Sequence, residues 1–210
     1  MLFSLKPTGT YTVRPDGADA YRMTPTEDGV GTFGVKLFLA SLSFLFAASI
    51  LLYLILMLPA ERPEVALLPV VGVGLGVATL VMLASSVTFA RALSAIRADD
   101  RKRFARLMGW TLGLGLAFMV AQSVNWAQLV AAGLPVDAEN RHSGFFVVLT
   151  VLHALHVVGG LVPLGIVTRR AARGDYTARH HEGARNVALY WHFLDVVWLL
   201  MLAAILAVSV

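Results

Sequence analysis

The chain has 210 residues, of which 58% are hydrophobic and 14% are charged, and its mean hydropathy is +0.73. This usage is far more apolar than that of a water-soluble globular domain, and stretches of about twenty apolar residues recur between short charged segments. There are no cysteines, which excludes disulfides, thiolate metal ligands, iron–sulfur clusters and covalently attached haem c. The isoelectric point near 9.8 reflects a one-sided basic excess, which indicates membrane topology rather than nucleic-acid binding.

The apolar stretches predict five transmembrane helices that follow a polar tail. The tail, residues 1–32, is rich in Gly, Pro, Thr and charged residues, and we expect it to be solvated. The predicted helices cover about residues 34–58, 65–89, 107–132, 144–167 and 186–208. We therefore expect an all-α integral membrane bundle formed by residues 33–210.

Basic residues decide the predicted orientation. Five spans place the tail, the predicted loop at residues 91–106 and the loop before residue 186 on one side of the membrane. Fifteen of the seventeen lysines and arginines lie on that side or at its edge, and only Arg62 and Arg141 lie on the other. Because cytoplasmic loops carry the excess of Lys and Arg, we expect a cytoplasmic N-terminus and an outer C-terminus, in a bacterial inner membrane.

Small and amide residues mark two features of the third predicted helix. Gly109, Gly113 and Ala117 recur every four residues, which predicts a smooth face for packing against a neighbouring helix. The amides follow at a spacing of three, which predicts that they share a face and bond a neighbouring helix; they are Gln122, Asn125 and Gln128.

The last two predicted helices hold the titratable residues of the membrane interior. His156 and Asp195 fall near the middle of their spans, His153 lies one turn toward the outer side, and His192 lies one turn toward the cytoplasm. Asp195 is the only carboxylate within a predicted span. A charge there costs at least about 2.5 kcal/mol, so this carboxyl group is expected to be neutral, paired or beside water.

Three interpretations of these residues remain open. In the structural one, His192 and Asp195, three residues apart on one face, bond each other or His156 on the preceding helix. In the second, the same groups relay protons. In the third, the imidazoles of His153, His156 and His192 ligate a haem or a metal, although their depths are staggered. The other three histidines lie in loops and are expected to be solvated.

The tryptophans are candidates for interfacial anchors or for packing residues. Trp126, Trp191 and Trp198 all fall in predicted spans, and Trp191, close to the cytoplasmic edge, fits the aromatic belt best. No phosphate loop, nucleophile elbow or zinc-protease helix is found in the sequence. The sequence therefore predicts no catalytic residues and no metal ligands.

Two segments resemble a known family. Residues 190–198 read YWHFLDVVW, which resembles the YWHFxDxVW signature at the start of the last helix of haem-copper oxidase subunit III. Residues 145–157 read FFVVLTVLHALHV and are similar to the family's FFxLTxxHxxHV stretch. Weaker similarities lie at residues 36–41 and 85–88 and at Gln122.

The resemblance implies the short five-helix bacterial form of subunit III and an accessory role. Such a subunit holds no redox cofactor, packs against catalytic subunits I and II that carry haem and copper, binds phospholipid between helix groups, and supports proton uptake and durable turnover. The sequence departs from the family at two positions. Leu42 stands where many members have glutamate, and Asn125 stands near a carboxylate position, which favours scaffolding and lipid binding over proton conduction.

We therefore expect an accessory subunit of a proton-pumping terminal oxidase, or of a related nitric oxide reductase. In that role the expected structural and lipid-contacting residues are His153, His156, His192, Asp195, Trp191, Trp198, Gln122 and Asn125. The alternative from another class is a haem-b membrane anchor that carries electrons from quinol. A transporter is disfavoured because the two halves show no matching broken helices.

Overall fold

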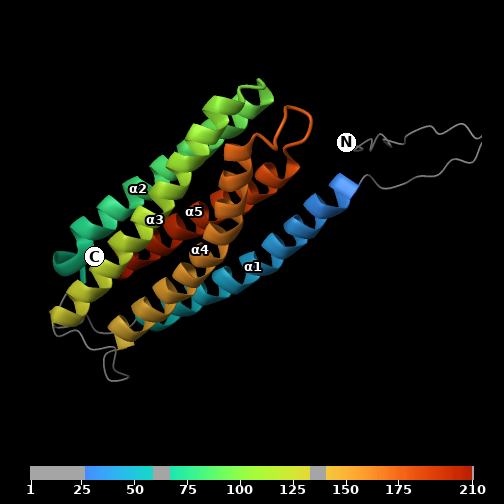
Figure 1. Cartoon of the computed structure of the whole chain (residues 1–210). Helices are drawn as coiled ribbons and strands as arrows, with labels where there is room; N and C mark the ends of the chain where they lie inside the picture. The colour runs from blue at the N-terminus through green and yellow to red at the C-terminus, as the bar shows by residue number, and fades with distance from the viewer. Residues whose placement is uncertain (1–26, 59–66, 133–140, 210) are drawn as a thin grey trace, which may run out of the picture.

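The fold is a bundle of five long helices, described by a computed structural model over residues 27–58, 67–132 and 141–209. The helices are α1 (Glu27–Met57), α2 (Leu67–Arg97), α3 (Arg101–Ala131), α4 (Arg141–Arg173) and α5 (Glu182–Ser209) (Figure 1). All five are long and apolar enough to cross a membrane. A helix satisfies its own backbone hydrogen bonds, which makes it a stable spanning structure in lipid. The predicted all-α membrane fold is confirmed.

The helices extend beyond the predicted apolar spans. The predicted loop at residues 91–106 is wrong, because α2 continues to Arg97 and α3 starts at Arg101. Residues 27–32, predicted as tail, already belong to α1, while residues 1–26 and the predicted start at 65 lie outside the described residues. A helix of about 30 residues is about 45 Å long, whereas the hydrocarbon core is about 30 Å thick. Hydropathy therefore marks the part in lipid rather than the helix ends.

A tight turn joins α2 to α3. Asp99 has a φ of 56°, in the left-handed region that Asp tolerates better than most residues. Asp100 is the N-cap of α3, and its Oδ1 accepts a hydrogen bond from the Arg103 backbone N–H at 3.0 Å. Its backbone carbonyl also accepts from Phe104. These contacts hold α2 and α3 as an antiparallel pair, as Figure 1 shows.

The fifth helix occupies the centre of the bundle. It packs against α1, α2 and α4, while α3 packs against α2 and α4. In Figure 1, α1 lies apart from the α2–α3 pair, with α4 and α5 between them. Large side chains fill the interior, and those with almost no exposed surface include Trp191, Trp198, Phe46, Phe118 and Phe146.

The predicted small-residue face of α3 does not pack against the described part of this chain. Gly109, Gly113 and Ala117 are exposed, and a Cβ added at either glycine would meet no atom within 4 Å. The close approach is on the opposite side, where a Cβ at Gly115 would meet the Trp191 ring at 2.9 Å. Spacing identified a smooth face but not the direction in which it points.

Candidate functional site

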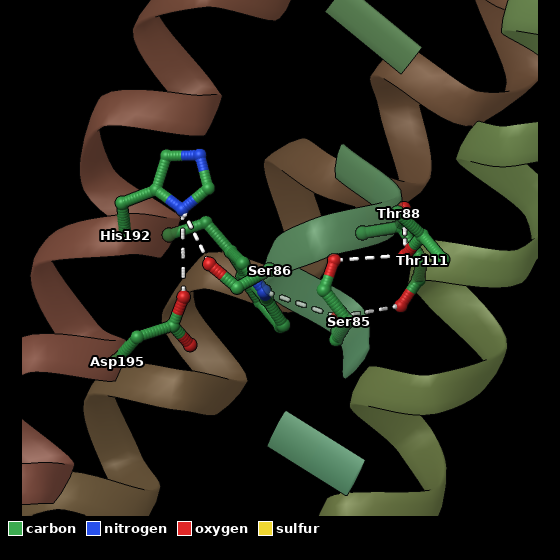
Figure 2. A network of polar contacts seen from close by, with 7 residues as sticks. Ser85, Ser86, Thr88, Thr111, His192 and Asp195 are labelled. Carbon is green, nitrogen blue, oxygen red and sulfur yellow. Dashed lines mark hydrogen bonds and ion pairs between the residues drawn. The ribbon is translucent and has the colours of Figure 1, made fainter. Parts of the chain in front are cut away.

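The motif at residues 190–198 forms a line of polar contacts along α5, and the first of these reach α2 and α3. The indole Nε1 of Trp191 donates to Ser85 Oγ at 3.2 Å, and Ser85 Oγ donates to the Thr111 carbonyl at 3.1 Å. Thr88 and Thr111 share a hydrogen bond between their hydroxyls at 2.9 Å (Figure 2). Side-chain bonds of this kind join helices where lipid offers no hydrophobic drive.

His192 and Asp195 form the second set of contacts. Nδ1 of His192 lies 2.7 Å from Ser86 Oγ on α2 and 3.5 Å from Asp195 Oδ2, one turn away on α5 (Figure 2). Asp195 is 5% exposed, and neither carboxylate oxygen has a hydrogen-bond partner among the described residues. The pairing along one helix face is the local arrangement that the three-residue spacing predicts.

His156 and His153 lie on α4 and are not in this pair. Nδ1 of His156 lies 2.7 Å from the Leu152 carbonyl of its own helix. The hydroxyl of Tyr190 donates to the His156 carbonyl at 2.9 Å, so the cross-helix bond uses the backbone of His156 rather than its ring. The alternative in which His156 bonds the His192–Asp195 pair across the helices does not occur among the described contacts.

His153 is enclosed by aromatic rings. Its side chain is 1% exposed, and its ring centroid lies 6.2 Å from those of Phe46 and Phe118 and 5.4 Å from that of Trp198. Neither ring nitrogen has a hydrogen-bond partner in the part of the chain that the structure describes. The geometry makes this histidine a packing residue of the core.

The three tryptophans considered from the sequence are packing residues, and the predicted belt position of Trp191 is wrong. Trp191 is fully buried, because its ring fills the space beside Gly115. Trp198 is 1% exposed and donates to Thr79 Oγ1 at 2.9 Å, and Trp126 donates to Thr150 Oγ1 at 3.2 Å. Position along the chain indicated depth in the membrane but not the direction in which a ring points.

Two of the three amides on α3 lie together in the interior. Asn125 Nδ2 donates to Gln122 Oε1 at 2.7 Å, and both side chains are almost fully buried. The Asn125 amide lies against Gly74 of α2, where a Cβ would collide with it. Gln128 is exposed instead, which corrects its predicted place on this face. Two steps of three residues turn the helix by about 600°, so the third amide points about 120° away from the first.

The hydroxyls that receive these bonds were not singled out as contact residues from the sequence. Thr79 and Ser86 on α2 are seven residues apart and therefore lie almost on one helix face. They meet Trp198 and His192, which are six residues apart on the antiparallel α5. A row of hydroxyls at this spacing within an apolar helix was the signal available in the sequence.

An apolar cavity of about 450 Å³ lies between α1, α4 and α5. Its walls include Phe38, Leu155, Gly159, Pro163 and Tyr190. His156 and Asn186 also line it and are its main polar groups. The volume and the apolar lining suit a hydrocarbon chain.

A polar pocket of about 380 Å³ lies at the turn between α4 and α5. Gly174 makes the turn with a φ of 79°. Tyr176, which is 8% exposed, packs edge-on against Phe104. Burial raises the pKa of the Tyr176 hydroxyl, while a hydrogen bond with Arg170 opposes that rise. The contact between Tyr176 and Phe104 joins this turn to the start of α3.

No grouping of three or more His, Asp or Glu side chains with metal-site geometry occurs among the described residues. The candidate site is therefore a set of interhelical bonds, made chiefly by Tyr190, Trp191, His192 and Trp198, with Asp195 beside His192 on α5. Its side chains join α5 to its neighbours. Ser86 Oγ and Asp195 Oδ2 both approach Nδ1 of His192, whereas in a catalytic triad the hydroxyl and the carboxylate meet different ring nitrogens.

Comparisons with known proteins agree with this structure. The family model for cytochrome c oxidase subunit III matches residues 20–209. Cytochrome c oxidase subunit 3 of Synechocystis sp. is 34% identical over 177 residues, which cover 80% of this chain and 72% of the relative. The subunit of Thermostichus vulcanus is 31% identical over 175 residues, which cover 80% of this chain and 82% of the relative. That of Cyprinus carpio is 35% identical over 127 residues, 60% of this chain and 47% of the relative. The chain belongs to the cytochrome c oxidase subunit III family.

Proposed function

We propose that the chain is the accessory subunit III of a respiratory haem-copper oxidase and that it acts by stabilising the catalytic subunits and by binding phospholipid. Membership of the family carries the subunit assignment. The proposal extends it to catalytic subunits I and II as partners and to the bacterial inner membrane as the location. Relatives from Synechocystis and Corynebacterium support a bacterial setting.

One observation carries the non-catalytic role. The polar atoms of the signature motif are used to hold helices together: Tyr190 bonds α4, and Trp191, His192 and Trp198 bond α2. Each such bond within a membrane contributes about 0.6–2 kcal/mol to the stability of helix packing. A motif used in this way fixes the shape of the bundle, which a docking subunit requires.

The cavity between α1, α4 and α5 supports the lipid-binding part of the proposal. An acyl chain would occupy the apolar cavity. Arginines at the cytoplasmic ends of α4 and α5 would bind an anionic head group. Each such arginine is worth about 1 kcal/mol near a membrane surface. They include Arg169, Arg170, Arg173 and Arg185.

Co-purification tests the accessory role. The tagged chain, extracted from its own membranes in mild detergent, is expected to bring with it a large subunit with haem absorbance and oxygen-reducing activity. Membranes that lack the chain should still reduce oxygen at first and then lose activity sooner during turnover. Isolation of the chain without any haem-bearing subunit contradicts the proposal.

A cavity-filling variant tests lipid binding. In Gly159→Phe the new ring occupies the cavity, since a Cβ there is 3.8 Å from the Tyr190 hydroxyl and no nearer to any other atom. We expect less phospholipid per protein after detergent washing, measured by mass spectrometry. Gly165→Phe is the control, because Gly165 lies on the same helix but does not line the cavity. Equal lipid content in the two variants contradicts the assignment.

Absorbance of the isolated chain tests the haem-anchor alternative. A haem would produce a Soret band that is lost in His156→Ala or His192→Ala. We expect no such band, because aromatic rings surround His153, and because His156 and His192 lie at different depths in the membrane whereas axial ligation requires imidazoles at matched depth. Nitric oxide consumption by the purified complex, in place of oxygen consumption, would identify a reductase instead.

A further inference from the structure

We propose that a transmembrane helix of another oxidase subunit docks on the outward face of α5, and that it presents a hydrogen-bond acceptor to Nε2 of His192. We define this α5 face by Leu189, His192, Val196 and Leu199, which expose between 37% and 55% of their surface. The inference rests on the proposed function, because it requires partner subunits in the membrane.

The α5 face lies between the contacts of α5 with α2 and with α1. Trp191 bonds Ser85 of α2, and Phe193 packs against Phe46 of α1 with ring centroids 6.3 Å apart. Successive residues turn a helix by about 100°, so His192 points between these two directions. The described parts of α1 and α2 pack on different partners, α1 on α4 and α2 on α3 in addition to α5. The α5 face between these two contacts therefore stays exposed.

A polar group at this position needs a protein partner. Asp195 lies near the middle of α5, and His192 is one turn away with 38% of its side chain exposed. Ionisable side chains at such depth face protein or water in membrane proteins, because lipid chains offer no hydrogen bond. Nδ1 is occupied by Ser86 and Asp195, whereas no hydrogen bond to Nε2 is found among the described residues.

The chemistry of the pair decides what the partner must present. A net charge near the bilayer centre is costly, so His192 and Asp195 are expected to be neutral as a pair. Among the described residues the Ser86 hydroxyl has no acceptor other than Nδ1 of His192, so a neutral imidazole accepts from Ser86 at Nδ1 and carries its proton on Nε2. An imidazolium beside a carboxylate also carries a proton on Nε2. In both forms the docking helix must offer an acceptor, such as a hydroxyl, an amide oxygen or a free backbone carbonyl.

The outward face of α3 serves as the comparison surface. It exposes Gly113, Ala117 and Val120, and its atoms require no hydrogen bond from a neighbour. Lipid chains satisfy such a surface, whereas they do not satisfy Nε2 of His192. Polarity, rather than apolar area, selects the α5 face for the subunit contact.

Photo-crosslinking in the assembled complex tests the proposal. A benzophenone amino acid is placed at Val196 or, as the matched control, at Val120; these side chains are 55% and 64% exposed. We expect a crosslink from position 196 to another oxidase subunit and none from position 120. A crosslink to a second copy of the chain, or to subunits from position 120 alone, overturns the assignment of the face.

Substitution of His192 tests the hydrogen bond itself. His192→Phe keeps a ring but removes the donor, whereas His192→Gln places an N–H near the position of Nε2. We expect His192→Phe to weaken association with the other subunits by about three- to twentyfold, with His192→Gln closer to wild type. Thermal unfolding of the isolated variants separates this effect from the loss of the Ser86 contact, which both substitutions share.

The outcomes distinguish the two proposals. If wild-type chain co-purifies with haem-bearing subunits and His192→Phe does so equally well, the hydrogen-bond proposal fails while the proposed function stands. If wild-type chain purifies without such subunits, the proposed function fails.

Discussion

Side chains of one type in this protein either join helices in the interior or lie exposed on the outside of the bundle. Composition alone does not distinguish the two cases. Trp191 and Trp110 are both tryptophans in transmembrane helices, yet the first is fully buried and the second is 63% exposed. The buried indole donates to Ser85 and fills the space beside Gly115. An indole on the outside of the bundle has no such contacts to lose, so its contribution to the fold is small.

A pair of substitutions measures this difference. Trp191→Phe leaves a void and removes the hydrogen bond to Ser85, and we expect it to lower the free energy of unfolding by about 1–3 kcal/mol. Trp110→Phe is the control and should change it by less than about 0.5 kcal/mol. Unfolding by SDS in mixed micelles, followed by far-UV circular dichroism, provides the measurement. Equal losses in the two variants contradict the buried role of Trp191.

Between helices, the decisive quantity is the distance of closest approach. At Gly115 a Cβ would lie 2.9 Å from the Trp191 ring and 3.0 Å from Leu161, whereas at Gly113 it would meet nothing within 4 Å. Glycine within a helix is otherwise disfavoured relative to alanine by about 1 kcal/mol. Substitution of glycine by alanine should therefore lower the stability of the bundle at Gly115 and maintain or raise it at Gly113.

We expect Gly115→Ala to destabilise the bundle by about 1–3 kcal/mol through overpacking against the Trp191 ring. Gly113→Ala should leave stability unchanged or raise it by up to about 1 kcal/mol. Apparent melting temperatures in one detergent, measured side by side, test both. A larger loss at Gly113 than at Gly115 would show that the predicted small-residue face of α3 is the packed one within this chain.

The short turn between α2 and α3 gives a second prediction for the helical elements. Asp100→Ala removes the side-chain acceptor of the Arg103 N–H, which should cost about 0.5–2 kcal/mol of stability. Asp100→Asn keeps a side-chain oxygen that can accept from the Arg103 N–H, and it should retain most of this stability. Comparing the melting temperatures of the two variants separates the effect of the lost capping hydrogen bond from the effect of the lost charge. If Asp100→Asn is as unstable as Asp100→Ala, charge rather than capping stabilises the turn.

For the whole molecule, the distribution of basic residues predicts orientation. The turn between α2 and α3 and the turn between α4 and α5 lie at the same end of the bundle (Figure 1), and this end carries the basic residues Arg97, Lys102, Arg106, Arg170 and Arg173. The positive-inside rule predicts that this end is cytoplasmic.

The absence of native cysteine makes that orientation directly measurable. Ala98→Cys labels the turn between α2 and α3, and Ala132→Cys labels the C-terminal end of α3. In intact spheroplasts, a membrane-impermeant maleimide should modify Ala132→Cys and leave Ala98→Cys unmodified until the membrane is opened. The reverse pattern would invert the predicted topology.

The number and approximate positions of the five spans follow from the sequence alone, because lipid requires about twenty consecutive apolar residues wherever a helix crosses it. The family also follows from the sequence, since the segment at residues 190–198 carries a specific motif in the expected place. Helix ends were less predictable, because charged residues such as Arg97 and Lys102 extend a helix into water as readily as they form a loop.

The direction in which each side chain points depends on how the helices pack against one another. Every face of a transmembrane helix is apolar, so hydropathy does not distinguish the lipid side from the protein side as it does in a soluble helix. For this reason the sequence placed Trp191 in the aromatic belt and Gln128 beside Asn125, and the structure corrected both. The sequence also placed Gly113 in a helix interface, and the described part of this chain supplies no neighbour there. The partners Ser85, Ser86 and Thr79 became visible once α2 was set against α5. Contacts between helices depend on rotation about each axis, and the packing of the whole bundle fixes that rotation.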